Sequence, residues 1–400
     1  MRGPVPRPIK DYCLGIYDGP HATPAESDDG PVFLGIKNIT ASGELDFSEI
    51  RHVSENEFPQ WTRRVTPQPL DVVFTYEASL HRYAVIPDGF RGCLGRRVAL
   101  IRPNQKLSDS RYLLYYFLSL EWRKVIEANV MSGATVDRIP LERFPSFPTR
   151  LPDLRTQRKV ADALSNYGDL IENNRRRMAL LEESARLLYR EWFVRLRFPG
   201  HEHTITVEGV PHGWERGSLK DVCREVRETV LPESMEPDTP YIGLEHIPRR
   251  SISLGEWGSV EQVTSSKHRF RSGDILFGKI RPYFHKVGVA FMDGVASSDA
   301  IVIRPVDKLF HGFVLMTVSS DEFVADTAQS MKEGSKMPRA DWKQMQAYTV
   351  ALPPPGLLST FEGMIQPVIA QLKALTFTNQ KLRTARDLLL PRLMSGELAV

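Results

Sequence analysis

The chain has 400 residues, which is long enough for two or three domains of ordinary size. Its 42% hydrophobic and 25% charged content is that of a globular protein and excludes global disorder and fibrous repeats. Lys and Arg number 52 against 49 Asp and Glu, so any affinity for nucleic acid has to come from local patches.

The compartment is indicated by the cysteines and by the apolar runs. Cys13, Cys93 and Cys223 are few, far apart and odd in number, which argues against a disulfide framework or a cysteine zinc site and for a reducing compartment. The longest apolar run, 112–120, is far shorter than the roughly 20 residues of a membrane span. The N-terminus has no signal-peptide core. These features predict a soluble cytoplasmic protein without a membrane partner.

The sequence repeats itself after a little over 200 residues. Four short strings recur in the same order, and their offset drifts smoothly, as two diverged copies with small loop changes would produce. The strings are FLGIKNI at 33–39 and YIGLEHI at 241–247, DVVF at 71–74 and DILF at 274–277, IRP at 101–103 and 303–305, and LP at 151–152 and 352–353.

Each copy has the same predicted anatomy. About 150 residues with short β-like runs, broken by Gly, Pro and Asp, come first. A proline-marked boundary follows, and then one long amphipathic segment. The predicted strands are 72–76 and 98–102 in the first copy and 274–277 and 300–304 in the second, and the predicted helical segments are 111–128 and 313–328.

The long segments carry the heptad seam of a coiled coil. Over 157–195, seam residues alternate four and three apart, which is narrower than the stripe of a globular surface helix. The same spacing recurs over 361–393, where Arg386 interrupts the seam and Pro367 predicts a kink or a fresh helix start. The seam residues include Leu164, Ile171, Asn174, Met178 and Leu181 in the first segment and Ile365, Leu372, Asn379 and Leu382 in the second.

Each seam holds one asparagine. A polar residue at a seam position costs stability but fixes register and partner. Asn174 and Asn379 would face each other if the helices pack antiparallel; the alternative is that each bonds to water or to a neighbouring carbonyl.

Several longer strings carry a family resemblance. They are DGPHATP at 18–24, QRKVAD at 157–162, WFV at 192–194 with RFPGHE at 197–202, and LLLPRLMSGEL at 388–398. Together with the two-copy layout they span almost the full chain. The chain resembles the specificity subunits of type I restriction–modification systems.

The resemblance implies an α+β fold. Two mixed α/β target recognition domains, 1–152 and 199–354, would be joined by two long antiparallel coiled-coil helices, 153–198 and 355–400, with a pseudo-twofold internal repeat. Each domain would read one half of a bipartite, asymmetric target in double-stranded DNA. The helices would set the spacer and dock two methyltransferase subunits, and motor-nuclease subunits would join the complex. No cofactor is expected in this non-catalytic chain, and S-adenosylmethionine is expected on the methyltransferase subunits.

Basic residues gather at equivalent places in the two copies. Six Lys and Arg stand against one acid over 267–290, and seven Arg stand against three acids over 63–102. Basic residues mixed with polar and aromatic ones suit phosphate anchoring and base reading, although a solvated basic face is the alternative. The segment 277–286 is strongly basic, whereas its counterpart 74–82 is nearly neutral, which predicts different half-sites. The predicted DNA-binding residues are Arg63, Arg64, Arg82, Arg96, Arg97, Thr135, Arg138, Lys267, Arg269, Lys279, Arg281, Tyr283, His285, Lys286, Lys336 and Arg339.

Other motifs do not support an enzyme. GDILFGK at 273–279 has the spacing of a phosphate-binding loop, but Ile280 replaces the metal-binding hydroxyl and DILF has the pattern of a buried strand. His201 and His203 lack a third ligand with recognisable spacing, so no metal is predicted. Two alternatives stay open, a coiled-coil scaffold without a DNA role and an enzyme with an unrecognised site.

Overall fold

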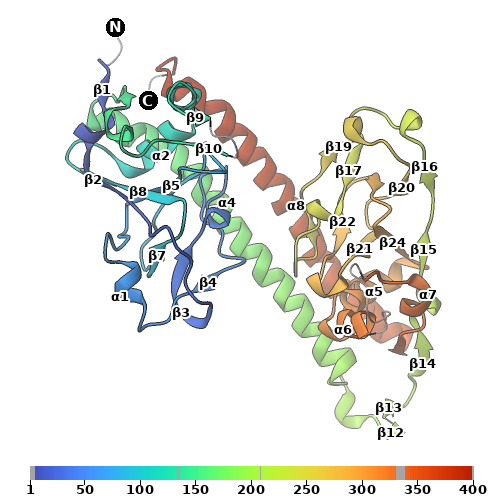
Figure 1. Ribbon diagram of the computed structural model, residues 1–400. Coiled ribbons are helices and arrows are strands. Elements are labelled where there is room, and N and C mark those ends of the chain that lie inside the picture. Colours follow the sequence, from blue (N-terminus) through green and yellow to red (C-terminus); the bar gives the residue numbers. More distant parts are fainter. Residues whose placement is uncertain (1–4, 133–135, 208, 330–337, 399–400) are drawn as a thin grey trace. The chain divides into compact units, whose positions relative to one another are not determined.

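The computed structural model describes residues 5–132, 136–207, 209–329 and 338–398, and the chain divides into two compact units. Unit 1 comprises Met1–Leu170 and Leu382–Val400, and unit 2 comprises Ile171–Lys381. Each unit contains one mixed α/β part and one end of two long helices, α4 (Leu154–Tyr189) and α8 (Pro355–Met394) (Figure 1). The predicted fold class is thereby confirmed.

Unit 1 is built on two small sheets. The first has the order β2 (Cys13–Asp18), β8 (Val98–Pro103), β5 (Val72–Thr75), β6 (Tyr83–Val85), and the second has the order β4 (Arg51–His52), β3 (Ser27–Leu34), β7 (Gly92–Leu94). Two short pairs complete the unit, β1 (Arg7–Pro8) with β11 (Pro148–Thr149) and β9 (Met131–Ser132) with β10 (Asp137–Arg138).

Unit 2 has the same plan with longer sheets. The first has the order β15 (Cys223–Val226), β24 (Ala300–Pro305), β21 (Ile275–Gly278), β22 (Val287–Ala290), β18 (Ser253–Leu254). The second has the order β16 (Thr229–Val230), β20 (Lys267–Phe270), β23 (Gly294–Ala296), β17 (Pro240–Ile242), β19 (Gly258–Ser259). The short pairs are β14 (Glu215–Ser218) with β25 (Thr349–Leu352) and β12 (Thr206–Val207) with β13 (Val210–Pro211).

The two copies share details of strand pairing. β3 pairs in parallel with β7, and β17 pairs in parallel with β23, in sheets whose other pairs are antiparallel. A glycine makes each parallel contact possible. A Cβ on Gly92 would lie 2.4 Å from the carbonyl oxygen of Val32, and one on Gly294 would lie 2.5 Å from that of Pro240. Only glycine fits such an approach of two backbones, so the repeat extends to backbone packing.

Each predicted short helical segment is two helices rather than one. The segment 111–128 contains α2 (Ser110–Leu118) and α3 (Leu120–Glu127), and 313–328 contains most of α5 (His311–Val318) and α6 (Asp321–Gln329). The cause is a serine that starts the second helix of each pair. Ser119 Oγ accepts a hydrogen bond from Trp122 N at 3.3 Å, and Ser320 Oγ accepts one from Phe323 N at 3.1 Å. Two single-turn helices, α1 (Phe58–Trp61) and α7 (Trp342–Met345), complete the set.

The long helices are continuous over most of their predicted lengths. α4 ends in one π-helical turn, Arg190–Val194. α8 continues through Pro367, which therefore does not start a new helix. Pro367 and Gly363, whose carbonyl the proline leaves without its helical donor, are both exposed, so water can satisfy that carbonyl.

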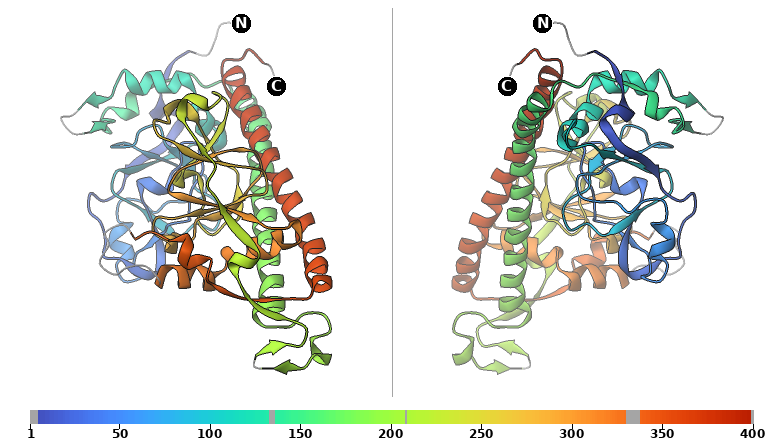
Figure 2. Two further views of the ribbon diagram at one scale, coloured as in Figure 1. Left: turned by 90° about the vertical axis from the view of Figure 1, so that its right-hand side faces the viewer. Right: turned by 90° about the vertical axis from the view of Figure 1, so that its left-hand side faces the viewer.

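The helices run antiparallel and lie side by side, α4 in green and α8 in red (Figure 2). Asn174 Nδ2 donates to Asn379 Oδ1 at 2.8 Å, and the rings of Trp192 and Phe361 lie 5.8 Å apart. Moving along α4 from Asn174 to Trp192 thus means moving back along α8 from Asn379 to Phe361. The asparagines bond to each other rather than to water alone, and both are buried.

The predicted seam residues line this pairing. Those buried in the interior are Leu164, Ile171, Asn174, Ile365, Leu372 and Asn379, and those half-buried are Met178, Leu181 and Leu382. Leu164 belongs to the hydrophobic core of unit 1, and Ile365 and Leu372 belong to that of unit 2. Within the described part of the chain, no helix combines the length and apolarity needed to cross a bilayer.

Candidate nucleic-acid interface

Three loops of the first copy meet where β5 ends. Tyr76 N donates to Arg97 O at 3.2 Å, and Ile139 N donates to Tyr76 O at 2.8 Å. Ala78 N also donates to Asp137 O at 3.3 Å. We call residues 76–78, 96–97 and 137–139 the three-loop edge of the first copy. It brings together Arg96, Arg97 and Arg138 of the predicted set.

The second copy has the same arrangement where β21 ends. Lys279 N donates to Asp299 O at 2.7 Å, Ala340 N donates to Lys279 O at 2.8 Å, and Arg281 N donates to Pro338 O at 2.9 Å. Residues 279–281, 298–299 and 338–340 form the three-loop edge of the second copy. It brings together Lys279, Arg281 and Arg339 of the predicted set, on a backbone hydrogen-bonded like that of the first.

Both edges contain left-handed backbone at a residue other than glycine. Ala78 has φ 70° and its counterpart Arg281 has φ 50°. Arg97 has φ 69° as well. Such residues are uncommon and persist only where the surroundings hold them, which is typical of binding sites and turns. Ala78 and Arg281 lie in the loops that follow β5 and β21, and Arg97 lies directly before β8.

The edge of the first copy carries a polar network. Arg97 Nε lies 2.8 Å from Glu77 Oε1, and the Arg138 guanidinium lies 5.8 Å from the centre of the Tyr76 ring. Burial, and next to it the neighbouring Asp18 carboxylate, raise the pKa of the Tyr76 hydroxyl, so this hydroxyl stays protonated at neutral pH.

Asp18 and His21 join this network although they are absent from the predicted set. Asp18 Oδ1 accepts from Arg64 Nη1 at 2.7 Å, and Asp18 Oδ2 lies 3.1 Å from His21 Nε2. His21 Nδ1 in turn lies 3.4 Å from Tyr76 Oη. The available signal was their place in the DGPHATP string, which charge counting alone passes over.

The edge of the second copy carries different side chains. Lys279 Nζ donates to Ser298 O at 2.9 Å, and burial lowers the pKa of its ammonium group. Arg339 Nη2 lies 3.4 Å from Asp299 Oδ1. Beside this edge, the guanidinium of Arg281 lies 5.8 Å from the centre of the Phe284 ring, and the next aromatic residue, Tyr283, is 53% exposed. Exposed cations, a carboxylate and a tyrosine are all available to a ligand here.

Four other predicted residues of the second copy bond to neighbouring groups of the same copy. His285 is buried, and its Nε2 lies 2.8 Å from Ser319 O. Lys267 is also buried, and its Nζ donates to Ser265 Oγ at 2.7 Å. Lys286 Nζ donates to Leu244 O at 2.5 Å, while the exposed Arg269 pairs with Glu228 at 3.4 Å. The structure thus assigns structural bonds to four predicted residues.

In the first copy, Arg82 has its Nη1 3.3 Å from Ile39 O, so it braces a loop. Arg63 is exposed. Thr135 and Lys336 lie outside the described residues.

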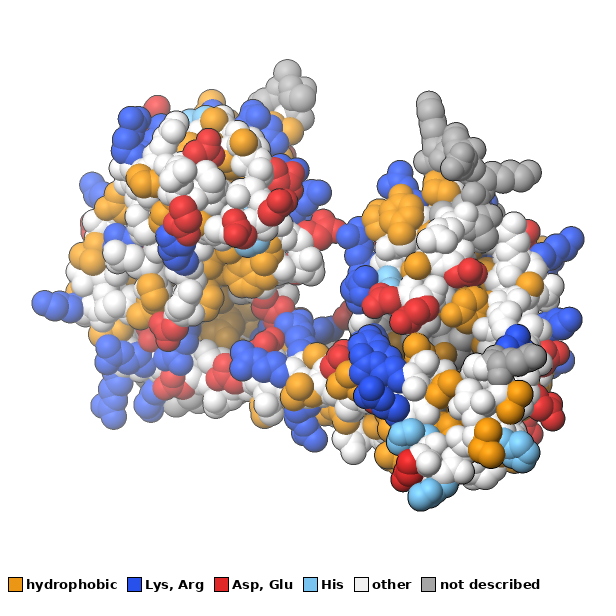
Figure 3. All heavy atoms as spheres, turned by 90° about the horizontal axis from the view of Figure 1, so that it is seen from below, with side chains coloured by type: hydrophobic (Ala, Val, Ile, Leu, Met, Phe, Trp, Pro, Cys, Tyr) orange, Lys and Arg blue, Asp and Glu red, His pale blue; other side chains and the backbone are white. Residues whose placement is uncertain are grey.

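Two ion pairs with buried carboxylates lie at the opposite end of β5 and β21 from the edges. Arg102, which had been counted in the basic patch, donates through Nε and Nη2 to Asp71 at 2.9 and 2.8 Å. Arg304 donates in the same bidentate way to Asp274 at 2.7 and 2.6 Å. The carboxylates are 2% and 3% exposed, so these arginines serve the fold. On the face drawn in Figure 3, basic side chains lie among acidic and hydrophobic ones.

The long helix α4 is bonded to the mixed α/β part of unit 2 through a buried carboxylate. Glu182 of α4 is 4% exposed, and its Oε1 accepts from Ser251 Oγ at 2.8 Å and from Ser253 Oγ at 2.7 Å. Its Oε2 accepts from Ile252 N at 3.2 Å. Arg250 N then donates to His285 O at 2.9 Å, which links this segment to the loop that carries Tyr283.

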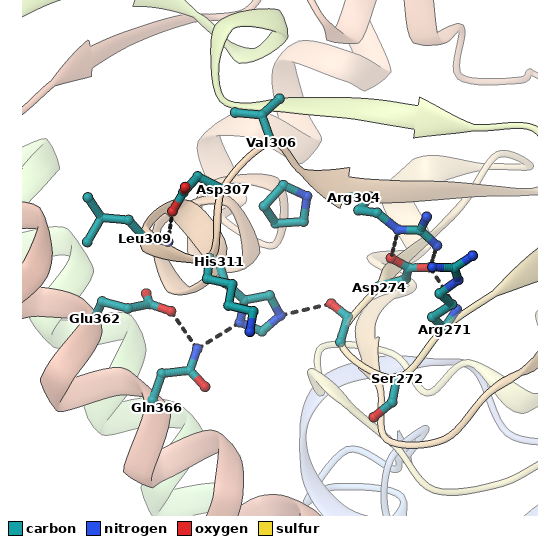
Figure 4. A pocket seen from close by; sticks show the side chains of 13 residues that line it. Arg271, Ser272, Asp274, Arg304, Val306, Asp307, Leu309, His311, Glu362 and Gln366 are labelled. Atoms are coloured by element: carbon teal, nitrogen blue, oxygen red, sulfur yellow. Dashed lines mark hydrogen bonds and ion pairs between the residues drawn. The ribbon is translucent and has the colours of Figure 1, made fainter.

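A cavity of about 880 Å³ lies between α8 and the mixed α/β part of unit 2 (Figure 4). Its polar groups bond to one another. His311 Nε2 lies 2.8 Å from Gly273 O, and Gln366 Nε2 lies 2.9 Å from His311 Nδ1 and 2.5 Å from Glu362 Oε1. Burial raises the pKa of the Glu362 carboxyl. These bonds connect α8, through His311, to the loop before β21, so the polar groups of the cavity hold the helix against the sheet.

Catalytic chemistry finds little support in these side chains. Burial raises the pKa of the thiols of Cys13, Cys93 and Cys223 to about 12, which leaves them without nucleophilic thiolate at neutral pH. Among the residues that the structure describes, no three His, Cys, Asp or Glu side chains are grouped to hold a metal ion.

Comparison with known proteins gives one consistent answer. Residues 38–183 match the family model of the type I restriction modification DNA specificity domain. The chain is 22% identical over 417 residues to the type I restriction enzyme MjaIX specificity subunit of Methanocaldococcus jannaschii, covering 98% of this chain and 89% of the relative. It is also 22% identical to the EcoDI specificity subunit of Escherichia coli, over 60% of this chain and 59% of that one.

A solved structure shows the same fold. The S subunit of a type I restriction–modification system from M. genitalium aligns with a TM-score of 0.54 at 14% identity, over 97% of this chain and 95% of that one. The repeated sheets and the paired helices agree with that fold, residues 38–183 match the type I restriction modification DNA specificity domain, and the chain is similar to specificity subunits of type I restriction–modification systems.

Proposed function

We propose that this chain directs a type I complex to a bipartite, asymmetric DNA sequence, each three-loop edge reading one half. The observation that carries the proposal is the repeated edge, in which the same backbone hydrogen bonds hold the partly exposed Arg97 in the first copy and Asp299 in the second. A protein that reads two different half-sites needs such a constant frame with variable side chains, because base edges differ in their donors and acceptors.

The long helices would set the spacer between the half-sites and dock two methyltransferase subunits. A continuous α-helix has a fixed rise per residue, which suits a ruler. S-adenosylmethionine would bind to the methyltransferase subunits, motor-nuclease subunits would join through them, and this chain would act in the cytoplasm without catalysing a reaction itself.

Salt dependence separates this proposal from a scaffold without a DNA role. Arginines and lysines that neutralise phosphates release counterions, so the logarithm of the binding constant falls linearly with that of the salt concentration. We expect the full chain to lose affinity for a duplex steeply between about 50 and 200 mM salt. An affinity that does not respond to salt, or no affinity, would leave the scaffold as the better reading.

A further inference from the structure

Comparison of the two edges separates side chains that would read bases from side chains that would bind phosphates. This inference rests on the proposed function. Position 97 of the first copy and position 299 of the second are equivalent, because each residue's carbonyl accepts from the residue that follows the equivalent strand, Tyr76 and Lys279. Positions 138 and 339 are equivalent in the same sense, because each forms an isolated antiparallel bridge to the opposite loop, to Glu77 and to Ile280.

These two pairs of positions differ in what they conserve between the copies. Arginine occupies both position 138 and position 339. At the other pair of equivalent positions, the first copy has arginine (97) and the second has aspartate (299), so the charge is reversed. The side chains of Arg97 and Asp299 are 31% and 32% exposed, and each is steadied by one ion pair, Arg97 with Glu77 and Asp299 with Arg339. A steadied and partly exposed group can present its remaining donors or acceptors in a fixed direction.

Phosphates are the same at every sequence, whereas base edges are not. A side chain shared by two readers of different half-sites therefore fits a phosphate, and a side chain that reverses charge fits a base. A guanidinium donates two hydrogen bonds to guanine O6 and N7, and a carboxylate accepts from the amino group of cytosine N4.

We propose that Arg97 and Asp299 are the opposed base readers of the two half-sites, for guanine and cytosine respectively, and that Arg138 and Arg339 are their shared phosphate anchors. The same backbone position thereby selects a different base in each copy. Exchange of the reading residue at this position is then a route to a new target without a change of fold.

The test selects duplexes from a library with both half-sites randomised, using the full chain and its variants. Asp299→Arg should replace cytosine by guanine at one position of one half-site and lower affinity for the original target about 5- to 150-fold. Arg97→Asp should change one base of the sequence selected at the other half-site. Arg97 tolerates this exchange at its positive φ, because aspartate is enriched in left-handed backbone.

Arg138→Ala is the matched control, because Arg97 pairs with Glu77 and not with Arg138, whereas Arg339 pairs with the reader Asp299 itself. Arg138→Ala should keep every selected base, weaken binding to all sequences alike and reduce the salt slope by about 1. Asp299→Asn is a milder second variant that should change cytosine to adenine, because asparagine pairs with adenine N6 and N7. Thermal unfolding of each variant identifies any that fails to fold, and the asparagine variant then carries the test.

The outcomes separate the inference from the proposed function. If the selected bases stay unchanged in the variants at 97 and 299, or change in the variant at 138, the assignment of base readers and phosphate anchors is overturned and the proposed function stays intact. A wild-type chain that selects no bipartite motif overturns both.

Discussion

The two copies share the buried ion pairs of their sheets and differ in residues that their three-loop edges expose. At the opposite end of β5 and of β21 from the edge, a buried aspartate holds an arginine in a bidentate pair, Asp71 with Arg102 and Asp274 with Arg304. At the edge itself, the partly exposed Arg97 is replaced by Asp299. The buried pairs are alike in the two copies, and an unpaired charge in the interior would be costly. The partly exposed Arg97 and Asp299 are under no such constraint.

Under the proposed function, this contrast would let one chain carry two specificities. The repeated backbone hydrogen bonds of each edge fix the positions from which the side chains project. The identity of those side chains then determines which groups of a ligand they can bind. The predictions below either break the shared frame or exchange the differing residues.

The largest effect is expected from breaking the buried pairs. Asp71→Asn or Asp274→Asn leaves a partly buried guanidinium without its counter-charge, and each should lower the free energy of unfolding by about 3 kcal/mol. Urea denaturation checks this, with the exposed Asp88→Asn as the control. A loss in one copy only would mean that the frames are not equivalent.

Exchanging Arg281, which has left-handed backbone, should have a smaller effect that is confined to binding at one half-site. Arg281→Ala gives the second copy the residue that the first has at Ala78, and removing a base contact costs about 1–3 kcal/mol of binding at one half-site. Ala78→Arg is the reciprocal change. Binding to duplexes altered in one half-site at a time is the measurement. Equal loss at both half-sites would contradict separate readers.

The asparagine pair tests the helices that both copies share. Asn174→Leu leaves the amide of the buried Asn379 without its partner, at a cost of about 1–3 kcal/mol of unfolding free energy. The double variant with Asn379→Leu should recover most of that loss, because no buried polar group then lacks a partner. A double-mutant cycle by urea denaturation measures the coupling, and additive losses would show that the bond contributes little.

The smallest effect concerns pH. Burial lowers the pKa of His285 and of its counterpart His81, so below the ordinary value near 6.5 the unfolded chain binds more protons than the folded chain. Stability should therefore fall as pH drops from about 7.5 to about 5.5. His285→Asn should flatten this dependence, because asparagine accepts the left-handed backbone at that position without titrating. Denaturation midpoints at three pH values decide it, and an unchanged slope would exclude His285 as the cause.

Periodic features were the part of the fold that the sequence predicted well. The heptad spacing identified the helix pair because a seam repeats over many turns, and the drifting offset identified the duplication. The breaks at Ser119 and Ser320 were missed because one capping serine is a weak local signal inside an otherwise helical run.

The candidate site was predictable only in outline. Counting charges located the basic segments, but it could not show that Arg102 faces inward to Asp71 or that Lys267 bonds to Ser265, since both depend on tertiary contacts. Asp299 went unnoticed because an acid does not register in a search for basic patches. Asp299 is singled out only when the hydrogen bonds of the two edges are compared, because its carbonyl accepts the same bond as that of Arg97.

The central claim, that this chain addresses a modification enzyme to one bipartite sequence, is tested most directly by the methylome of cells with and without its gene, the methyltransferase partner left intact. We expect one bipartite, asymmetric methylated motif to disappear when the gene is removed. An unchanged methylome in cells whose partner methyltransferase is active would contradict the claim.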